Sequence, residues 1–125
     1  MTQPIEIETR SVVERYFAAW TAKQERETRA LLAEDLDAST PLNTYRTAEP
    51  FVAGLMRVAG MLRGARIVSS VVEGDRAALL YDFDLPEPVG TLRAAWFLRV
   101  EGGKIRSVQQ QYDATEFRKV FARAS

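Results

Sequence analysis

The sequence contains no cysteine and no histidine. Without cysteine, the chain has no disulfide and no thiolate nucleophile. The absence of histidine removes both the commonest general base and the commonest transition-metal ligand. Acid–base chemistry would therefore fall to carboxylates, tyrosine or lysine, and we expect neither a metal site nor a cofactor.

The sequence also lacks an excess of charge of either sign and any long hydrophobic run. Lys plus Arg and Asp plus Glu both number 17, so no basic surface points to nucleic acid or to an anionic membrane. No apolar run reaches the length of a membrane span, and the acidic N-terminus lacks the core of a signal peptide. We expect a cytoplasmic protein that binds neither nucleic acid nor membrane.

The length and composition are those of one globular domain. The chain has 125 residues, of which 46% are hydrophobic, which is enough to bury a core and to enclose a cavity. We expect a single domain over residues 1–125, with residues 1–8 flexible.

Three segments of the first half carry helical patterns. Ser11 followed by Glu14 is a capping box, and the helix it predicts has an apolar stripe that ends at Trp20. Residues 24–33 predict a shorter helix. Thr47 is the expected N-cap of a third helix, which should stop at Gly64.

The second half alternates with the period of β-strands. Residues 36–40 predict a short strand, followed by a loop over 41–46. The runs 65–73 and 76–85 flank Gly74-Asp75, and the runs 91–100 and 104–112 flank Glu-Gly-Gly at 101–103, so both pairs predict hairpins. Asp113, with Glu116 three residues later, predicts the cap of a terminal helix. The order predicts an α+β fold in which a curved antiparallel sheet wraps around the N-terminal helices and forms a cone-shaped cavity.

Several segments resemble the nuclear transport factor 2-like superfamily, which includes ketosteroid isomerases, limonene-epoxide hydrolases and SnoaL-like polyketide cyclases. They are VVERYFAAW at 12–20, LAED at 32–35, GKI at 103–105 and YDATEF at 112–117. The resemblance covers nearly the whole chain. It implies a cone-shaped α+β barrel, of cystatin-like type, and a homodimer.

The resemblance also implies that the known catalytic acids are not retained. Tyr16 falls at the oxyanion-donor tyrosine of ketosteroid isomerases, but their general-base aspartate falls on Thr40 and their protonated aspartate on Trp96. The last-strand acid of the epoxide hydrolases and cyclases falls on or near Gln110. A hydroxyl, an indole and an amide cannot replace a carboxyl group in these reactions. Whether the protein is an enzyme stays open.

The leading hypothesis is a domain that binds a small hydrophobic or amphiphilic molecule in a mostly apolar pocket, with no assigned reaction. Gln110 is in phase with Val108 and should face inward, either toward a ligand or as a structural amide. Trp20 and Trp96 either line the cavity or fill it. The predicted ligand-binding residues are Tyr16, Trp20, Thr40, Tyr45, Phe83, Trp96, Gln110 and Tyr112.

Two alternatives follow from the strand phase. Asp82 and Asp84 share one strand face, so either could act as the base of an isomerase, epoxide hydrolase or cyclase if that face lined the cavity. The apolar residues that alternate with them, Leu79, Tyr81, Phe83 and Leu85, predict instead that the aspartates face outward. Phe97 makes the outer face of its strand apolar as well, which predicts a non-catalytic interaction module that forms a homodimer through the outer sheet face.

Overall fold

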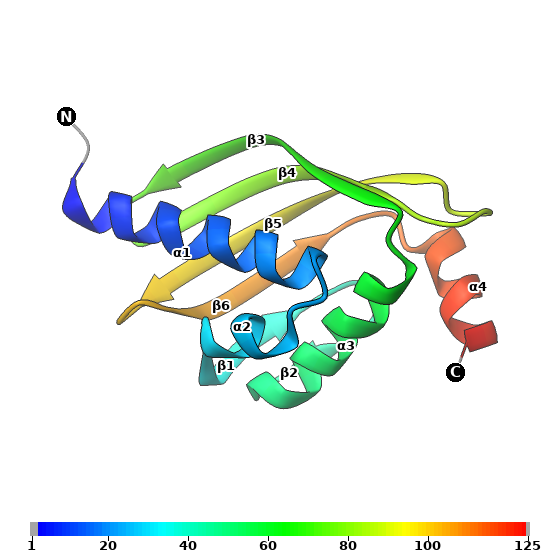
Figure 1. The fold of residues 1–125 in the computed structure, drawn as a ribbon, viewed down its shortest axis with the longest axis horizontal. Coiled ribbons are helices and arrows are strands. Elements are labelled where there is room, and N and C mark those ends of the chain that lie inside the picture. The colour runs from blue at the N-terminus through cyan, green and yellow to red at the C-terminus, as the bar shows by residue number, and fades with distance from the viewer. Residues whose placement is uncertain (1–2, 125) are drawn as a thin grey trace.

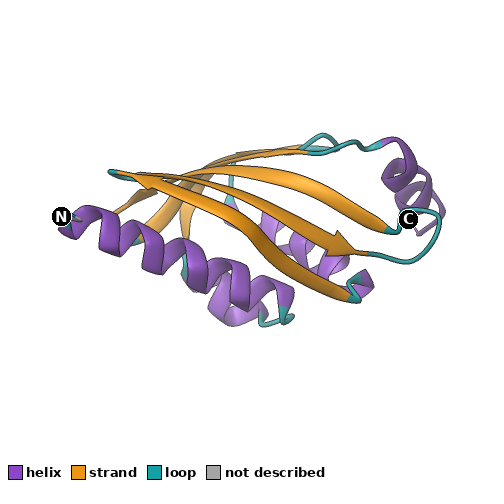
Figure 2. Cartoon of the chain, turned by 90° about the horizontal axis from the view of Figure 1, so that it is seen from above, coloured by secondary structure: helices purple, strands orange, loops and turns teal. Residues whose placement is uncertain are grey.

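The computed structural model describes residues 3–124 as a curved sheet with helices on its inner face (Figure 1). Figure 2 shows α1, α2 and α3 on that face, whereas α4 lies beyond one end of the strands. The α+β class is therefore confirmed. The elements in chain order are α1 (Pro4–Thr21), α2 (Glu25–Ala30), β1 (Leu32–Ser39), β2 (Thr44–Tyr45), α3 (Ala48–Met61), β3 (Gly64–Glu73), β4 (Arg76–Asp84), β5 (Thr91–Glu101), β6 (Lys104–Gln111) and α4 (Thr115–Ala124).

Both predicted hairpins are present in the sheet. β3, β4, β5 and β6 form an antiparallel meander. Gly74 has a φ of 59°, and Gly102 and Gly103 have φ of 61° and 76°, which glycine adopts without steric cost. Because Glu101 pairs with Lys104, the second turn has two residues rather than the expected three.

The sheet is mixed and open, so two parts of the expected architecture are wrong. The strand order is β2-β1-β6-β5-β4-β3, and β1 runs parallel to β6. The parallel pair arises because α3 carries the chain from one edge of the sheet to the other before the meander begins. Within the described residues, β2 and β3 remain edges that do not pair with each other, so the sheet does not close into a barrel.

The first helix begins at Pro4, not at Ser11. The segment 1–8 that we expected to be flexible therefore includes the first turn of this helix. Pro4 is compatible with that turn because the first helical position tolerates proline. The extension is held by the β3–β4 turn: the Gly74 amide donates to Glu6 Oε2 at 3.0 Å, and Thr9 Oγ1 donates to the Gly74 carbonyl at 2.8 Å. Residues 1–2 lie outside the described residues.

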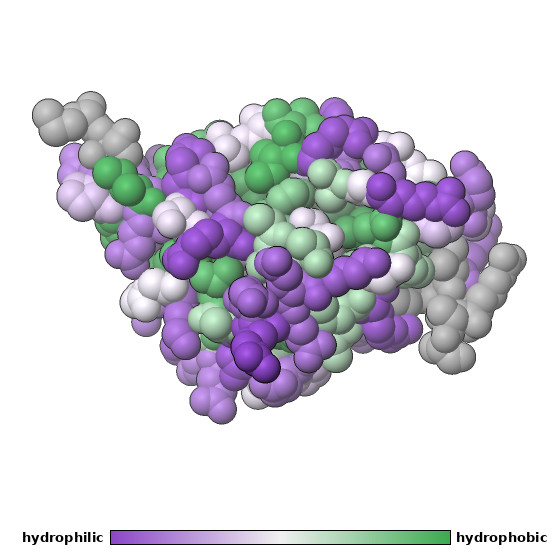
Figure 3. All heavy atoms as spheres, viewed as in Figure 1, coloured by the Kyte–Doolittle hydropathy of each residue, from purple (hydrophilic) through white to green (hydrophobic). Residues whose placement is uncertain are grey.

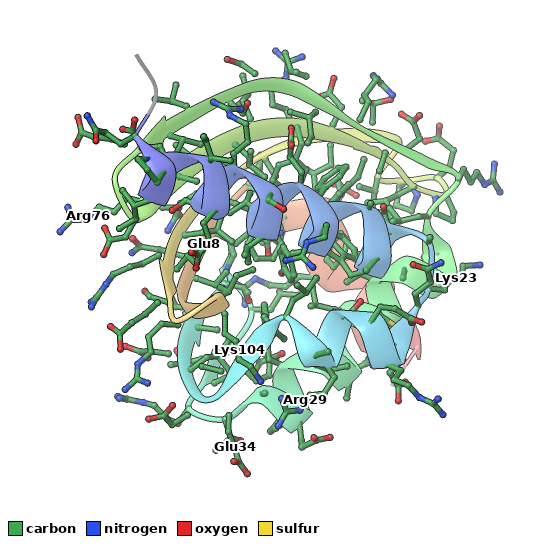
Figure 4. The ribbon with its side chains drawn as sticks, turned by 60° about the vertical axis from the view of Figure 1, so that its left-hand side comes forward. Glu8, Lys23, Arg29, Glu34, Arg76 and Lys104 are labelled. Atoms are coloured by element: carbon green, nitrogen blue, oxygen red, sulfur yellow. The ribbon has the colours of Figure 1, made fainter. Side chains whose placement is uncertain are left out.

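The boundary between α2 and β1 also lies earlier than predicted. The second helix ends at Ala30, and the strand begins at Leu32 because it pairs with Ile105 of β6. Arg29 connects α2 to α3 through an ion pair with Glu49 at 2.7 Å, and Figure 4 shows Arg29 near this junction.

The surface of the helical face is mainly hydrophilic. Figure 3 shows that hydrophilic residues surround smaller hydrophobic patches there.

A cluster of aromatic rings forms the centre of the core. Trp96 of β5 stacks on Tyr81 of β4 with centroids 5.8 Å apart, and Tyr16 of α1 meets it edge-on at 5.7 Å. Phe51 of α3 lies 6.3 Å from Trp96. Each such pair contributes roughly 0.5–1.5 kcal/mol beyond the burial of its area. The cluster therefore holds both long helices against the sheet.

We expect Gly60→Ala to stabilise the protein. Gly60 lies in the last turn of α3, and an added Cβ would have no neighbouring atom within 4 Å. Removing the backbone freedom of a helical glycine should raise the free energy of unfolding by roughly 0.5–1 kcal/mol. Urea denaturation checks this value.

The matched control is Gly54→Ala in the same helix. A Cβ at Gly54 would lie 2.9 Å from Tyr45 Oη, so Tyr45 must shift and the gain should be smaller or absent. A lower free energy of unfolding in Gly60→Ala than in the unsubstituted protein would contradict the expectation.

Candidate functional site

A cavity of about 290 Å³ lies between α3, the loop after β1 and the inner face of the sheet. Its wall is mostly aromatic and aliphatic, with a few hydroxyl and amide groups. The residues that line it are Trp20, Thr40, Leu42, Asn43, Tyr45, Phe51, Gly54, Leu55, Arg57, Val58, Phe83, Leu92, Gln110, Tyr112 and Phe117.

Six of the eight residues predicted from the sequence lie in this wall: Trp20, Thr40, Tyr45, Phe83, Gln110 and Tyr112. Each comes from a different element or connection, so the fold brings together residues that are far apart in the chain. The wall includes the indole of Trp20, which therefore does not fill the cavity. That these residues bind a ligand stays a prediction.

Tyr16 and Trp96 lie in the core instead of the wall, which corrects their expected place. Each is 1% exposed. Trp96 does face inward from β5, but Tyr81 and Phe51 cover its ring, and Tyr16 packs against its edge. Trp96 is therefore part of the core.

The helix α3 contributes the largest group of wall residues that the sequence did not reveal. Phe51, Leu55 and Val58 are apolar residues of α3 that line the cavity, and Gly54 lies among them. A glycine among large apolar residues on a helix face leaves space beside it, and this is the signal that was available. Arg57 gave no such signal, because an exposed arginine on a helix is ordinary.

Gln110 forms a structural hydrogen bond and also lines the cavity. Its Nε2 donates to Tyr81 Oη at 2.6 Å, so the amide is part of a buried hydrogen bond, and the same side chain lines the cavity. Burial raises the pKa of Tyr81 well above its ordinary value, more than the bond from Gln110 lowers it. Tyr81 is therefore a neutral phenol at physiological pH.

The other buried tyrosines near the cavity are neutral as well. Burial raises the pKa of Tyr16 well above 10 and raises the pKa of Tyr112 to about 12. These phenols can donate hydrogen bonds but do not act as bases near neutral pH.

Three buried donors have no hydrogen-bond partner among the described residues. They are Tyr16 Oη, Trp20 Nε1 and Trp96 Nε1. An unpaired buried donor costs about 1–3 kcal/mol, so groups that can accept a hydrogen bond are favoured beside it. Of the three, only Trp20 belongs to the wall of the cavity.

Asp82 and Asp84 lie on the outer face of the sheet, as the strand phase predicted. Asp82 is only 6% exposed because arginines cover it. Arg93 donates to both of its oxygens, at 2.8 and 3.0 Å, and Arg66 donates to it at 3.4 Å. Arg66 also donates to Asp84 at 3.0 Å.

This network gives neither aspartate the position of a base. The hydrogen bonds and charge of Arg93, with the charge of Arg66, lower the pKa of Asp82 despite its burial. The residues between and beside the two aspartates, Tyr81 and Phe83, face the interior, so the carboxylates lie on the other side of the sheet from the cavity.

We expect Asp82→Asn to destabilise the protein at neutral pH. A carboxyl group whose pKa is lowered by folding contributes stability above its unfolded pKa of about 4, and loses it as the pH falls through the folded value. The difference in unfolding free energy between the variant and the unsubstituted protein should therefore shrink as the pH falls below about 4. Thermal unfolding at several pH values checks this, and a difference that does not change with pH would contradict it.

The described residues contain neither a metal-binding cluster nor a membrane-spanning helix. No group of three or more histidine, cysteine, aspartate or glutamate side chains in residues 3–124 is arranged to hold a metal ion. None of the helices in that range is both long and apolar enough to cross a membrane.

Solved structures of other proteins share this fold. A Kribbella flavida protein has a TM-score of 0.83 and 24% identity, over 91% of this chain and 93% of that one. An NTF2-like protein from Cytophaga hutchinsonii has a TM-score of 0.73 and 20% identity, over 97% and 99%. A second Kribbella flavida protein, named as a candidate ketosteroid isomerase, has a TM-score of 0.73 and 21% identity, over 86% and 79%. At these identities the likeness shows the fold alone.

Sequence comparison assigns the family. No curated protein matches this chain. The sequence pattern of the SnoaL-like domain, however, matches residues 13–108, well over half of the chain. The structural neighbours agree with this match, and the resemblance inferred from the sequence is confirmed. The chain therefore belongs to the SnoaL-like domain family.

Proposed function

We propose that this protein binds a small, largely apolar molecule in the cavity beside α3. The observation that carries the proposal is a cavity of about 290 Å³ with an aromatic and aliphatic wall that a few polar groups interrupt. Ligand cavities of folded proteins have this composition, and this one is near the lower end of their usual range of about 300–1,000 Å³. A ligand of one or two rings fits that size.

The wall supplies both affinity and orientation. Burying ligand surface against Trp20, Phe51 and Phe83 contributes about 0.8 kcal/mol for each methylene group removed from water. The amide of Gln110 provides hydrogen bonds that would fix the ligand in one orientation.

We propose binding without assigning a reaction. Within the described residues, no carboxylate lines the cavity, so an acid like those of the isomerases, epoxide hydrolases and cyclases has no counterpart there. The alternative enzyme, with Asp82 or Asp84 as base, gains no support from carboxylates that arginines hold on the outer sheet face.

The proposal is tested by measuring thermal unfolding in the presence of small neutral aromatic ketones, alcohols and amides. A ligand that binds the folded state at about 100 times its Kd stabilises it by about 2.7 kcal/mol, which raises Tm. In Gln110→Leu, the Kd of a responding compound should rise about tenfold, the effect of losing about 1.4 kcal/mol from one hydrogen bond.

Gln109→Leu provides the matched control, since Gln109 is exposed and directly precedes Gln110 in β6. It should leave the Kd unchanged. The proposal fails if no compound raises Tm, or if both leucine variants bind a responding compound as the unsubstituted protein does.

We also propose that the protein forms a homodimer through the outer face of the sheet. Val71, Ala78 and Phe97 are direct neighbours across β3, β4 and β5. Val71 is 62% exposed and Phe97 is 50% exposed, although both are large and apolar. Charged residues follow on both sides of this row: Arg66, Asp82 and Arg93 toward one end of the strands, and Glu73, Arg76 and Arg99 toward the other. An apolar centre with a charged rim is a common composition of protein interfaces.

Phe97→Arg should convert the homodimer to a monomer, because it places two buried charges at the centre of a symmetric interface. Size-exclusion chromatography with light scattering measures the change. Phe97→Leu, which keeps an apolar side chain, should remain dimeric. A monomeric unsubstituted protein would contradict the proposal.

A further inference from the structure

The charged groups around the cavity are unevenly distributed. Among the described residues that line it, Arg57 is the one with a charged side chain. The remaining polar groups of the wall are neutral, and Tyr112 stays protonated at physiological pH since its pKa is about 12. A ligand in the cavity therefore meets one positive group and no negative one.

The positive group lies at the exposed end of the cavity. Arg57 and Asn43 are exposed, whereas Trp20, Phe51 and Phe83 are buried. The wall thus changes from apolar and buried to polar and exposed. Arg57 is three residues after Gly54 and so lies beside it on α3, and both residues line the cavity.

A second arginine adds to the positive potential at this rim. Arg118 of α4 donates from Nη2 to the carbonyl of Pro41 at 2.9 Å, in the loop that borders the cavity. Its charge also acts on Tyr112, whose pKa it lowers against the larger effect of burial.

Two carboxylates at the start of α4 have partners of their own. Asp113 accepts a hydrogen bond from the amide of Thr115, the first residue of α4, at 3.0 Å. Glu116 pairs with Lys119 at 3.1 Å.

We infer that the cavity takes an organic acid, with its apolar body against the buried aromatic wall and its carboxylate on Arg57. This inference rests on the proposed function and names its ligand class. A guanidinium presents paired N–H donors that match a carboxylate, and the exposed position lets the acid enter without losing all of its hydration. The size of the cavity suits an acid of one or two rings.

The test compares two probes of nearly equal shape, 1-naphthaleneacetate and its neutral amide, 1-naphthaleneacetamide. Calorimetry at low salt gives the Kd of each. We expect Arg57→Gln to raise the Kd of the acetate about tenfold, which corresponds to about 1.4 kcal/mol, and to change the Kd of the amide less than twofold. Added salt should weaken binding of the acetate only.

Two further variants separate the guanidinium from general charge and from folding. Arg26→Gln removes the same charge from an exposed position of α2, outside the cavity, and should leave both Kd values unchanged. Arg57→Lys retains a point charge and should recover part of the affinity for the acetate. Thermal unfolding shows whether each variant is folded.

The outcomes distinguish this inference from the proposed function. If the amide binds but Arg57→Gln changes the two Kd values equally, or changes neither, the assignment of an acid is wrong and the cavity still binds ligands. If Arg26→Gln weakens the acetate as much as Arg57→Gln does, the effect is one of overall charge and the assignment also fails. If neither probe binds and no neutral compound raises Tm, both proposals fail together.

Discussion

The packing of Trp96 is the interaction on which the rest of the structure depends. Its ring contacts Tyr16 and Trp20 from α1, Phe51 from α3 and Tyr81 from the neighbouring strand. Two helices that do not follow each other directly in the chain are thereby fixed to the same point of the sheet. The cavity is the space that remains between α3 and the sheet beyond this cluster. The edge of the aromatic cluster therefore sets the position of the cavity.

Strand register brings together two positions that the resemblance compares with the catalytic acids of related enzymes. Trp96 and Gln110 are direct neighbours across β5 and β6. Of the three positions that the resemblance compares with catalytic acids, Thr40, Trp96 and Gln110, two therefore lie side by side, and they carry a large ring and a neutral amide. The ring enlarges the core, and the amide bonds to Tyr81. This region now stabilises the fold and borders the cavity, and it contains no group that titrates near neutral pH.

Local patterns predicted much of this molecule, because its turns and hairpins depend on neighbouring residues. Gly74-Asp75 and the glycines at 102 and 103 give turns that hold whatever the rest of the chain does. The early start of α1 depends on Gly74, which is far away in sequence, and the parallel place of β1 depends on β6. Within the cavity wall, strand phase identified Phe83 and Gln110, whereas Arg57 is positioned by the way α3 lies on the sheet. Contacts between segments that are far apart in the chain produce no periodic pattern in the sequence, so the pattern could not predict them.

The parallel pairing of β1 with β6 has a consequence for how the chain reaches its folded state. Residues 32–39 find their main partner only in residues 104–111, so most of the polypeptide must be present before the first strand is inserted. Until then, β1 has only the two-residue β2 beside it. Contacts between distant parts of a chain slow folding, because the loop between them must lose its conformational freedom first. On a ribosome, the meander of β3, β4 and β5 would form earlier, and the final strand would join the two halves of the sheet in one late step.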